Sequence, residues 1–179
     1  SDLAYHPDDD RIYTSVTVGI VRIDPATGRT DPVIPVGGQP KKLVISDDGL
    51  FIHMLTDSSD TITRLNLTTM LVDLHFQADT TPGEFHRKIW DIAAVPGRPE
   101  AILVSLYYPC CSPPGGGIVV FEGGRLLPKK VMGELGSSEG EKLAFDEVQE
   151  RDFTLERAIS SNHLNPLRVQ KDGVVGLAQ

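Results

Sequence analysis

The chain has 179 residues, of which 40% are hydrophobic and 23% are charged, as is typical of a folded domain and not of a disordered tail. No apolar run approaches the roughly 20 residues needed to cross a bilayer, so we expect no membrane span. The formal net charge of −8 disfavours nucleic acid and anionic lipid as partners. The length suits one domain or two.

The first predicted unit opens with an apolar strand in residues 2–6, an acidic turn and a second apolar strand up to residue 16. Residues 19–30, GIVRIDPATGRT, add a third strand and a turn, and DPVIPV adds an outer strand. The turn has a clear mechanism, because proline presets φ and glycine permits positive φ. The unit therefore predicts about four short strands.

The same pattern, an apolar strand, a turn and a second apolar strand, recurs in residues 42–55, 91–106 and 142–156. A further apolar strand and a polar turn follow each copy. Apolar residues alternate in these segments, the period-2 signature of a half-buried strand. The leading apolar residues Leu3, Leu43, Ile92 and Leu143 are separated by 40, 49 and 51 residues. A period of about 40–50 residues with four strands per unit is typical of a β-propeller blade.

We therefore predict an all-β fold, a β-propeller of about four blades of four antiparallel strands, with approximate blades at residues 1–40, 41–89, 90–140 and 141–179. A β-sandwich also has strands every 8–12 residues. A β-sandwich does not explain why the whole pattern of strands and turns repeats along the chain. The chain starts with Ser1, and both ends read as strands, so we expect a piece of a longer protein.

Four phrases carry a family resemblance: LAYHPDDDRIYTSV, VRIDPATGRT, VGGQPKKLVISDDG and RLNLTTM. They resemble the YVTN-type, lactonase-like β-propeller repeats of bacterial proteins over residues 2–121, and the resemblance is weak from Gly136 onward. These are fold motifs and not catalytic motifs. The resemblance implies a ring of roughly six to eight blades, so four units are about half a ring. Either the remaining blades are missing from this chain, or two chains complete a ring, or the four blades close into a ring by themselves.

Bare terminal blades would expose apolar faces and unpaired strand edges, which seldom stay uncovered. We therefore expect a protein partner, or a second copy of the chain, to bind through the terminal blades. A small-molecule ligand is the other partner that the sequence leaves open.

Within the third unit, the loop that follows residues 91–106 holds adjacent cysteines, Cys110 and Cys111, beside Tyr107 and Tyr108. It is an insertion, since 28 residues separate Ile92 from Val120 where 22 separate Leu43 from Leu65. Extra residues between strands lie on a face of a propeller, where binding usually occurs. The cysteines form either a strained vicinal disulfide or two thiols in an exposed loop.

A second candidate is the connection before the third unit, where His86 and Arg87 either line a propeller mouth or join two blades, with Trp90 packed between the blades. No histidine has metal-ligand spacing. We predict neither a metal nor a cofactor and assign no catalytic residue. The candidate ligand-binding residues are Tyr107, Tyr108, Cys110, Cys111, His86 and Arg87.

Two hypotheses for function remain. The first is a non-catalytic scaffold or binding module of an exported bacterial protein, extracellular or periplasmic, because the fold motifs come without a catalytic constellation. The second is a lactonase-like hydrolase acting on a small sugar lactone or ester, with or without a metal. It rests on fold analogy alone, which is a weak warrant for function.

Overall fold

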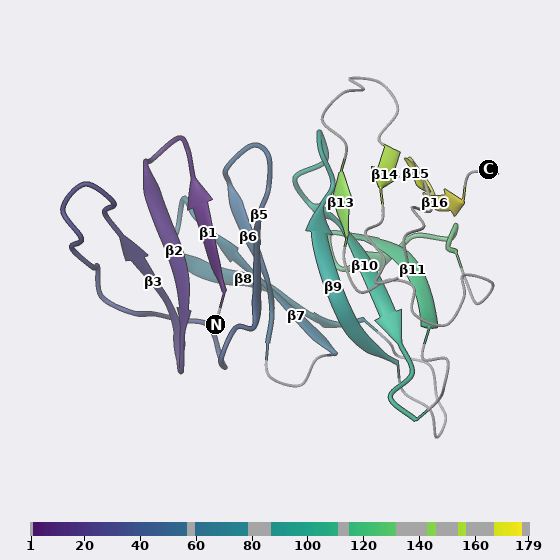
Figure 1. The fold of residues 1–179 in the computed structure, drawn as a ribbon, viewed down its shortest axis with the longest axis horizontal. Coiled ribbons are helices and arrows are strands. Elements are labelled where there is room, and N and C mark those ends of the chain that lie inside the picture. Colours follow the sequence, from purple (N-terminus) through teal and green to yellow (C-terminus); the bar gives the residue numbers. More distant parts are fainter. Residues whose placement is uncertain are drawn as a thin grey trace.

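The computed structural model describes residues 2–56, 60–78, 87–110, 115–131, 143–145, 154–156 and 167–176. Within these ranges the chain forms sixteen strands in four sheets of four. Neighbouring strands pair antiparallel in chain order, and the sheets follow one another across the molecule (Figure 1). The predicted all-β fold with antiparallel sheets is therefore confirmed.

The first and second sheets come from the repeats with the clearest turn signals. The first contains β1 (Leu3–His6), β2 (Arg11–Val16), β3 (Gly19–Ile23) and β4 (Ile34–Pro35). The second contains β5 (Lys42–Ile45), β6 (Phe51–Leu55), β7 (Thr61–Asn66) and β8 (Leu71–Gln77).

The third sheet has the longest strands, and the fourth has short ones. The third contains β9 (Lys88–Ala94), β10 (Ala101–Tyr107), β11 (Gly115–Glu122) and β12 (Arg125–Leu126). The fourth contains β13 (Ala144–Phe145), β14 (Thr154–Glu156), β15 (Leu167–Gln170) and β16 (Gly173–Gly176).

The core lies between the sheets, in three apolar clusters that each join one sheet to the next. Tyr13 and Ile20 of the first sheet pack with Leu43 and Met54 of the second. The next cluster joins the second and third sheets, and the last joins the third and fourth. The first strands β1, β5 and β9 are neighbours, so we call them the inner strands. Radial sheets stacked in chain order are the blades of a β-propeller, and the two-sheet sandwich is excluded.

The turns between third and fourth strands repeat a side-chain cap. The Oδ1 atom of Asp24 accepts the backbone N–H groups of Ala26 and Thr27, and Oδ1 of Asn66 accepts those of Thr68 and Thr69. Each turn then needs a residue at positive φ. Gly28 fills that position in the first sheet with φ of 68°, and Met70 fills it in the second with φ of 56°.

We predict that Met70→Gly stabilises the protein. A non-glycine residue in the left-handed region costs about 1–2 kcal/mol, and the added flexibility of glycine in the unfolded chain offsets part of this. The free energy of unfolding in urea should rise by about 0.5–1 kcal/mol. Thr69→Gly is the matched control, because Thr69 is exposed and does not have positive φ, and it should destabilise. A loss of stability in Met70→Gly equal to that of Thr69→Gly would contradict the prediction.

Candidate binding site

The first three sheets carry a charged residue at an equivalent position: Lys42 in β5, Asp91 in β9, and Asp2 directly before β1. Oδ2 of Asp2 accepts the backbone N–H of Leu43 at 2.9 Å. Oδ2 of the buried Asp91 accepts the N–H of Leu143 at 2.9 Å, and its Oδ1 lies 3.0 Å from Nζ of Lys42. Asp91 therefore connects the second, third and fourth sheets.

Asp2 and Asp91 also have equivalent partners for their backbone N–H groups. The backbone N–H of Asp2 donates to Oγ of Ser15 at 2.8 Å, and that of Asp91 donates to Oγ of Ser105 at 3.1 Å. At this position the first and third sheets thus carry an aspartate, and the second sheet carries a lysine. A carboxylate that accepts an N–H of the following sheet and a cation of the preceding sheet is a clamp between sheets, so we assign these residues a structural role.

Two buried histidines also connect successive sheets. His6 in β1 hydrogen-bonds the carbonyl of Gly49, in the β5–β6 turn, through Nε2 at 2.8 Å. His53 in β6 reaches the carbonyl of Pro99, in the β9–β10 turn, through Nε2 at 3.1 Å. Burial lowers the pKa of His53 to about 4, and the nearby guanidinium of Arg64 adds to this. His53 is therefore neutral at pH 7 and donates from Nε2.

The inner strand of the third sheet extends beyond Asp91 toward lower residue numbers, whereas the inner strands of the first and second sheets begin at or directly after the equivalent residue. β5 starts at Lys42, the residue equivalent to Asp91, whereas β9 begins three residues earlier, at Lys88. β10 correspondingly runs on from Ser105 to Tyr107. Part of the predicted insertion therefore lengthens strands. We call this end of β9, β10 and β11 the strand extension.

Two β-bulges shape the strand extension. On β9, Ser105 pairs with Asp91 but Leu106 pairs with Ile89, which leaves Trp90 as the extra residue. On β11, Leu106 pairs with Gly117 and Tyr107 with Gly115, which leaves Gly116 as the extra residue. A Cβ on Gly116 would lie 2.7 Å from the carbonyl carbon of Leu106, so only glycine fits there. Bulges re-aim side chains and are frequent beside functional sites.

The strand extension displays aromatic side chains. The half-buried Trp90 packs against Tyr107, with ring centroids 5.1 Å apart and planes at 49°. Tyr108 follows directly and is half-exposed. Arg87 is buried, and its Nη1 donates to the carbonyl of Gly116 at 3.4 Å. A buried arginine thus supports the bulge, and the aromatic rings remain partly open to solvent.

The structure brings together four of the residues singled out from the sequence. Tyr107, Tyr108, Arg87 and Trp90 lie at the strand extension, and Cys110 is exposed just beyond it, as expected for the loop. Trp90 packs on Tyr107 of its own sheet. His86 and Cys111 lie outside the described residues, so the structure tests neither the vicinal disulfide nor the alternative of two thiols.

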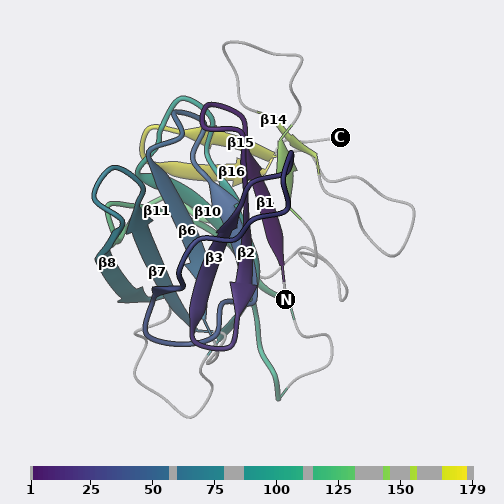
Figure 2. The same cartoon turned by 90° about the vertical axis from the view of Figure 1, so that its left-hand side faces the viewer.

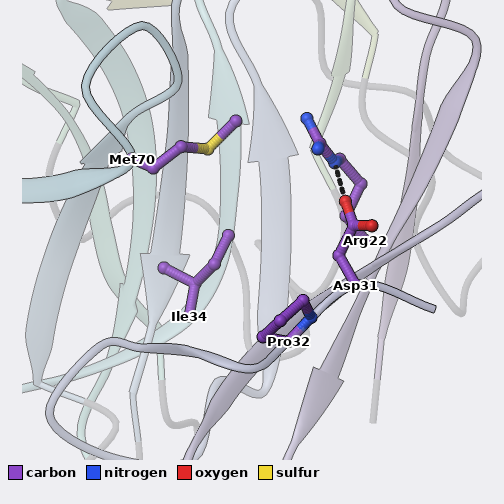
Figure 3. Close-up of a pocket in the computed structure, with 5 residues that line it drawn as sticks. All are labelled: Arg22, Asp31, Pro32, Ile34 and Met70. Atoms are coloured by element: carbon purple, nitrogen blue, oxygen red, sulfur yellow. Dashed lines mark hydrogen bonds and ion pairs between the residues drawn. The ribbon is translucent and has the colours of Figure 1, made fainter.

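A shallow hollow of about 350 Å³, which the sequence did not point to, lies between the outer strands of the first and second sheets (Figure 3). Its apolar wall is formed by Pro32, Ile34 and Met70, and its charged side by Arg22 and Asp31. Arg22 is already ion-paired with Asp31 and lies 4.0 Å from Asp9. The charged groups of the hollow are therefore engaged with each other.

The described residues contain no group of three or more histidine, cysteine, aspartate or glutamate side chains placed to hold a metal ion. In that same part of the chain, no helix has the length and apolar character to cross a membrane.

Comparison with solved structures supports the β-propeller fold. The WD40 repeats of RRP9 align with a TM-score of 0.63 and 14% identity over 98% of this chain and 49% of theirs. The structure of U3-55K gives the same TM-score and identity over 98% and 50%. A protein from Lactobacillus plantarum aligns with a TM-score of 0.72 and 14% identity over 99% and 53%. The chain thus spans about half the length of these structures.

At such low identity the likeness concerns the fold alone. No protein-family model matches the chain, and no curated protein matches it. The chain is a β-propeller, and the YVTN-type, lactonase-like assignment stays a prediction.

Proposed function

We propose that this chain is a non-catalytic β-propeller scaffold that binds another protein at the strand extension of the third sheet. The observation that carries this proposal is the pair of bulges that hold Trp90 and Tyr107 at the end of β9 and β10. The extension lies past the Asp91 clamp, so its rings are not needed to join neighbouring sheets.

The chemistry of the strand extension supports a protein partner. Tryptophan and tyrosine supply large, rigid contact area and dominate the energetics of protein interfaces. The support beneath them is rigid, because a buried arginine and a paired strand fix the backbone. A preorganised surface loses little entropy when it binds. The solved WD40-repeat propellers that share this fold are in keeping with a scaffold role.

We predict that a photo-reactive benzophenone amino acid in place of Tyr108 captures one discrete protein in cells that make the chain. The same probe in place of the exposed Glu100, in the β9–β10 turn at the opposite end of the sheet, should capture none of it. Adding Trp90→Ala should reduce the adduct about tenfold or more, since an aromatic anchor contributes about 2 kcal/mol or more. Circular dichroism confirms that the variant folds. Equal capture from both positions, or none from position 108, would contradict the proposal.

A second copy of the chain is the other partner that we propose, with contact through the first and fourth sheets. An uncovered blade face is large and apolar, and such surfaces usually mark interaction sites. Export from the cytoplasm is also part of the proposal and rests on the resemblance to bacterial repeats.

A further inference from the structure

The face of the first sheet that points away from the second sheet is apolar. We call it the leading face and define it by Leu3, Ile12, Thr14, Val21 and Ile23. None of these side chains belongs to the three apolar clusters that the described residues form between sheets. In Figure 2 the first sheet, in purple, lies at the front of the molecule. Apolar faces of this kind usually mark interaction sites.

The equivalent residues of the second and third sheets are core residues, because the preceding sheet covers them. Leu3 starts a row that crosses β1, β2 and β3, as Leu43 does in the second sheet and Ile92 in the third. Leu43 is 4% exposed and Ile92 is 1% exposed, whereas Leu3 is 65% exposed. The leading face thus has the composition of a sheet interface, and among the described residues no sheet packs on it.

The charge at the edge of this face specifies what would cover it. Asp91 uses Oδ2 for the N–H of Leu143 in the following sheet and Oδ1 for Lys42 of the preceding sheet. Asp2 uses Oδ2 in the same way, for the N–H of Leu43. The equivalent partner of its Oδ1 is an ammonium group on the inner strand of a preceding sheet, and no lysine or arginine of the described residues is ion-paired with Asp2.

We propose that the leading face binds a propeller blade of a second protein, whose inner strand carries a lysine at the position of Lys42 and pairs it with Asp2. Lys42 itself is already 3.0 Å from Asp91, so the lysine for Asp2 comes from another molecule. The surface is separate from the strand extension, and the proposal therefore does not depend on the contact proposed there.

The second sheet shows how such a blade would fit. It is the sheet that precedes an aspartate-bearing sheet within this chain, and besides Lys42 it presents the buried Leu55 and Ile62 to the third sheet. A partner blade needs the same two features, an apolar face and a lysine at its edge. The fold has room for further blades, since this chain spans 49–53% of the solved propellers that it matches.

A tandem chain tests the fit directly. A copy of residues 1–90 is fused ahead of Asp2, so that Asp2 follows a sheet bearing Lys42 at the spacing at which Asp91 does. Leu3→Asp, made behind the added copy, should raise the unfolding equilibrium constant at least tenfold, because Leu3 then has the buried position of Leu43. In the natural chain the same change should shift it about twofold or less, as is usual for a surface residue.

Leu71→Asp is the matched control for the tandem chain. Leu71 is 66% exposed, as Leu3 is, but lies on the outer strand β8, so its replacement should have a small effect in both chains. A Leu3→Asp effect that is equally small in the natural and the tandem chain would show that the leading face does not accept a blade, and would overturn the proposal.

The charge pair is tested in the same tandem chain. Lys42→Met in the added copy and Asp2→Asn behind it are measured singly and together in urea. Asparagine can still accept the N–H of Leu43, so the cycle reports on the ion pair. The coupling should change the unfolding equilibrium constant about fivefold or more, as for residues in contact, and strictly additive effects would exclude the lysine.

A photo-reactive benzophenone amino acid in place of Leu3 of the natural chain tests whether a second protein supplies the blade. We expect an adduct whose captured peptide, sequenced by mass spectrometry, has a lysine directly before an apolar strand. The same probe in place of Leu71 should not give it, and Trp90→Ala should leave it unchanged. Capture of this chain's own peptides would make a second copy the cover. That result, a peptide without such a lysine, or no adduct would each overturn the proposal.

Discussion

Replacing Asp91 with alanine is expected to lower the free energy of unfolding by about 1–3 kcal/mol, because the hydrogen bond and the ion pair of a buried carboxylate are lost together. The side chain is buried and holds Lys42 of the preceding sheet and the N–H of Leu143 of the following one. The alanine variant leaves that N–H without its acceptor, and an unsatisfied buried donor costs about 1–3 kcal/mol. Urea denaturation followed by circular dichroism measures the loss.

Asp91→Asn separates the two parts of this effect. The asparagine oxygen can still accept the N–H of Leu143, but the negative charge opposite Lys42 is lost. We therefore expect a destabilisation smaller than that of Asp91→Ala. The Asp91 clamp would be excluded if the alanine variant lost less than about 0.5 kcal/mol, the usual range for a surface substitution.

Acid is expected to destabilise the protein through His53. The pKa of this histidine is about 4 in the folded chain against an ordinary value of 6.5, so the unfolded chain binds the proton more strongly. The stabilisation from a neutral His53 is fully present above pH 6.5 and is lost progressively as the pH falls to about 4. Linkage gives a loss of the order of 3 kcal/mol across this window.

His53→Gln should flatten this pH dependence, because glutamine can donate to the carbonyl of Pro99 and does not titrate. The measurement is the free energy of unfolding in urea between pH 7.5 and pH 4. His75→Gln is the control for the loss of a histidine, since His75 is an exposed residue of the same sheet. If His53→Gln and wild type lost stability in parallel from pH 6.5 to 4, His53 would not be the group responsible.

The sheets could be predicted from the sequence because local patterns determine them. Alternating apolar residues and the Asp24 and Asn66 turns are encoded within a few neighbouring residues, and each turn was found where its residues predicted it. The repeat of four strands then implied stacked blades, since one sheet cannot bury both faces alone.

The candidate site was harder to predict because it depends on register. The sequence drew attention to Tyr107 and Tyr108, but a bulge at Trp90 or Gly116 appears only when the paired strands are known. The burial of Arg87 likewise depends on β11 reaching back to it. The inner-strand clamp had a visible signal, in the phrases DLA, KLV, DIA and KLA, but its meaning needs the contact between neighbouring sheets.

A double-mutant cycle on Lys42 and Asp91 tests most directly whether the charged inner-strand position joins one sheet to the next. Free energies of unfolding are measured for wild type, Lys42→Met, Asp91→Asn and the double variant. We predict a coupling energy of about 1 kcal/mol or more, within the range measured for residues in contact. Losses that add to within about 0.3 kcal/mol, as for distant independent sites, would contradict the clamp.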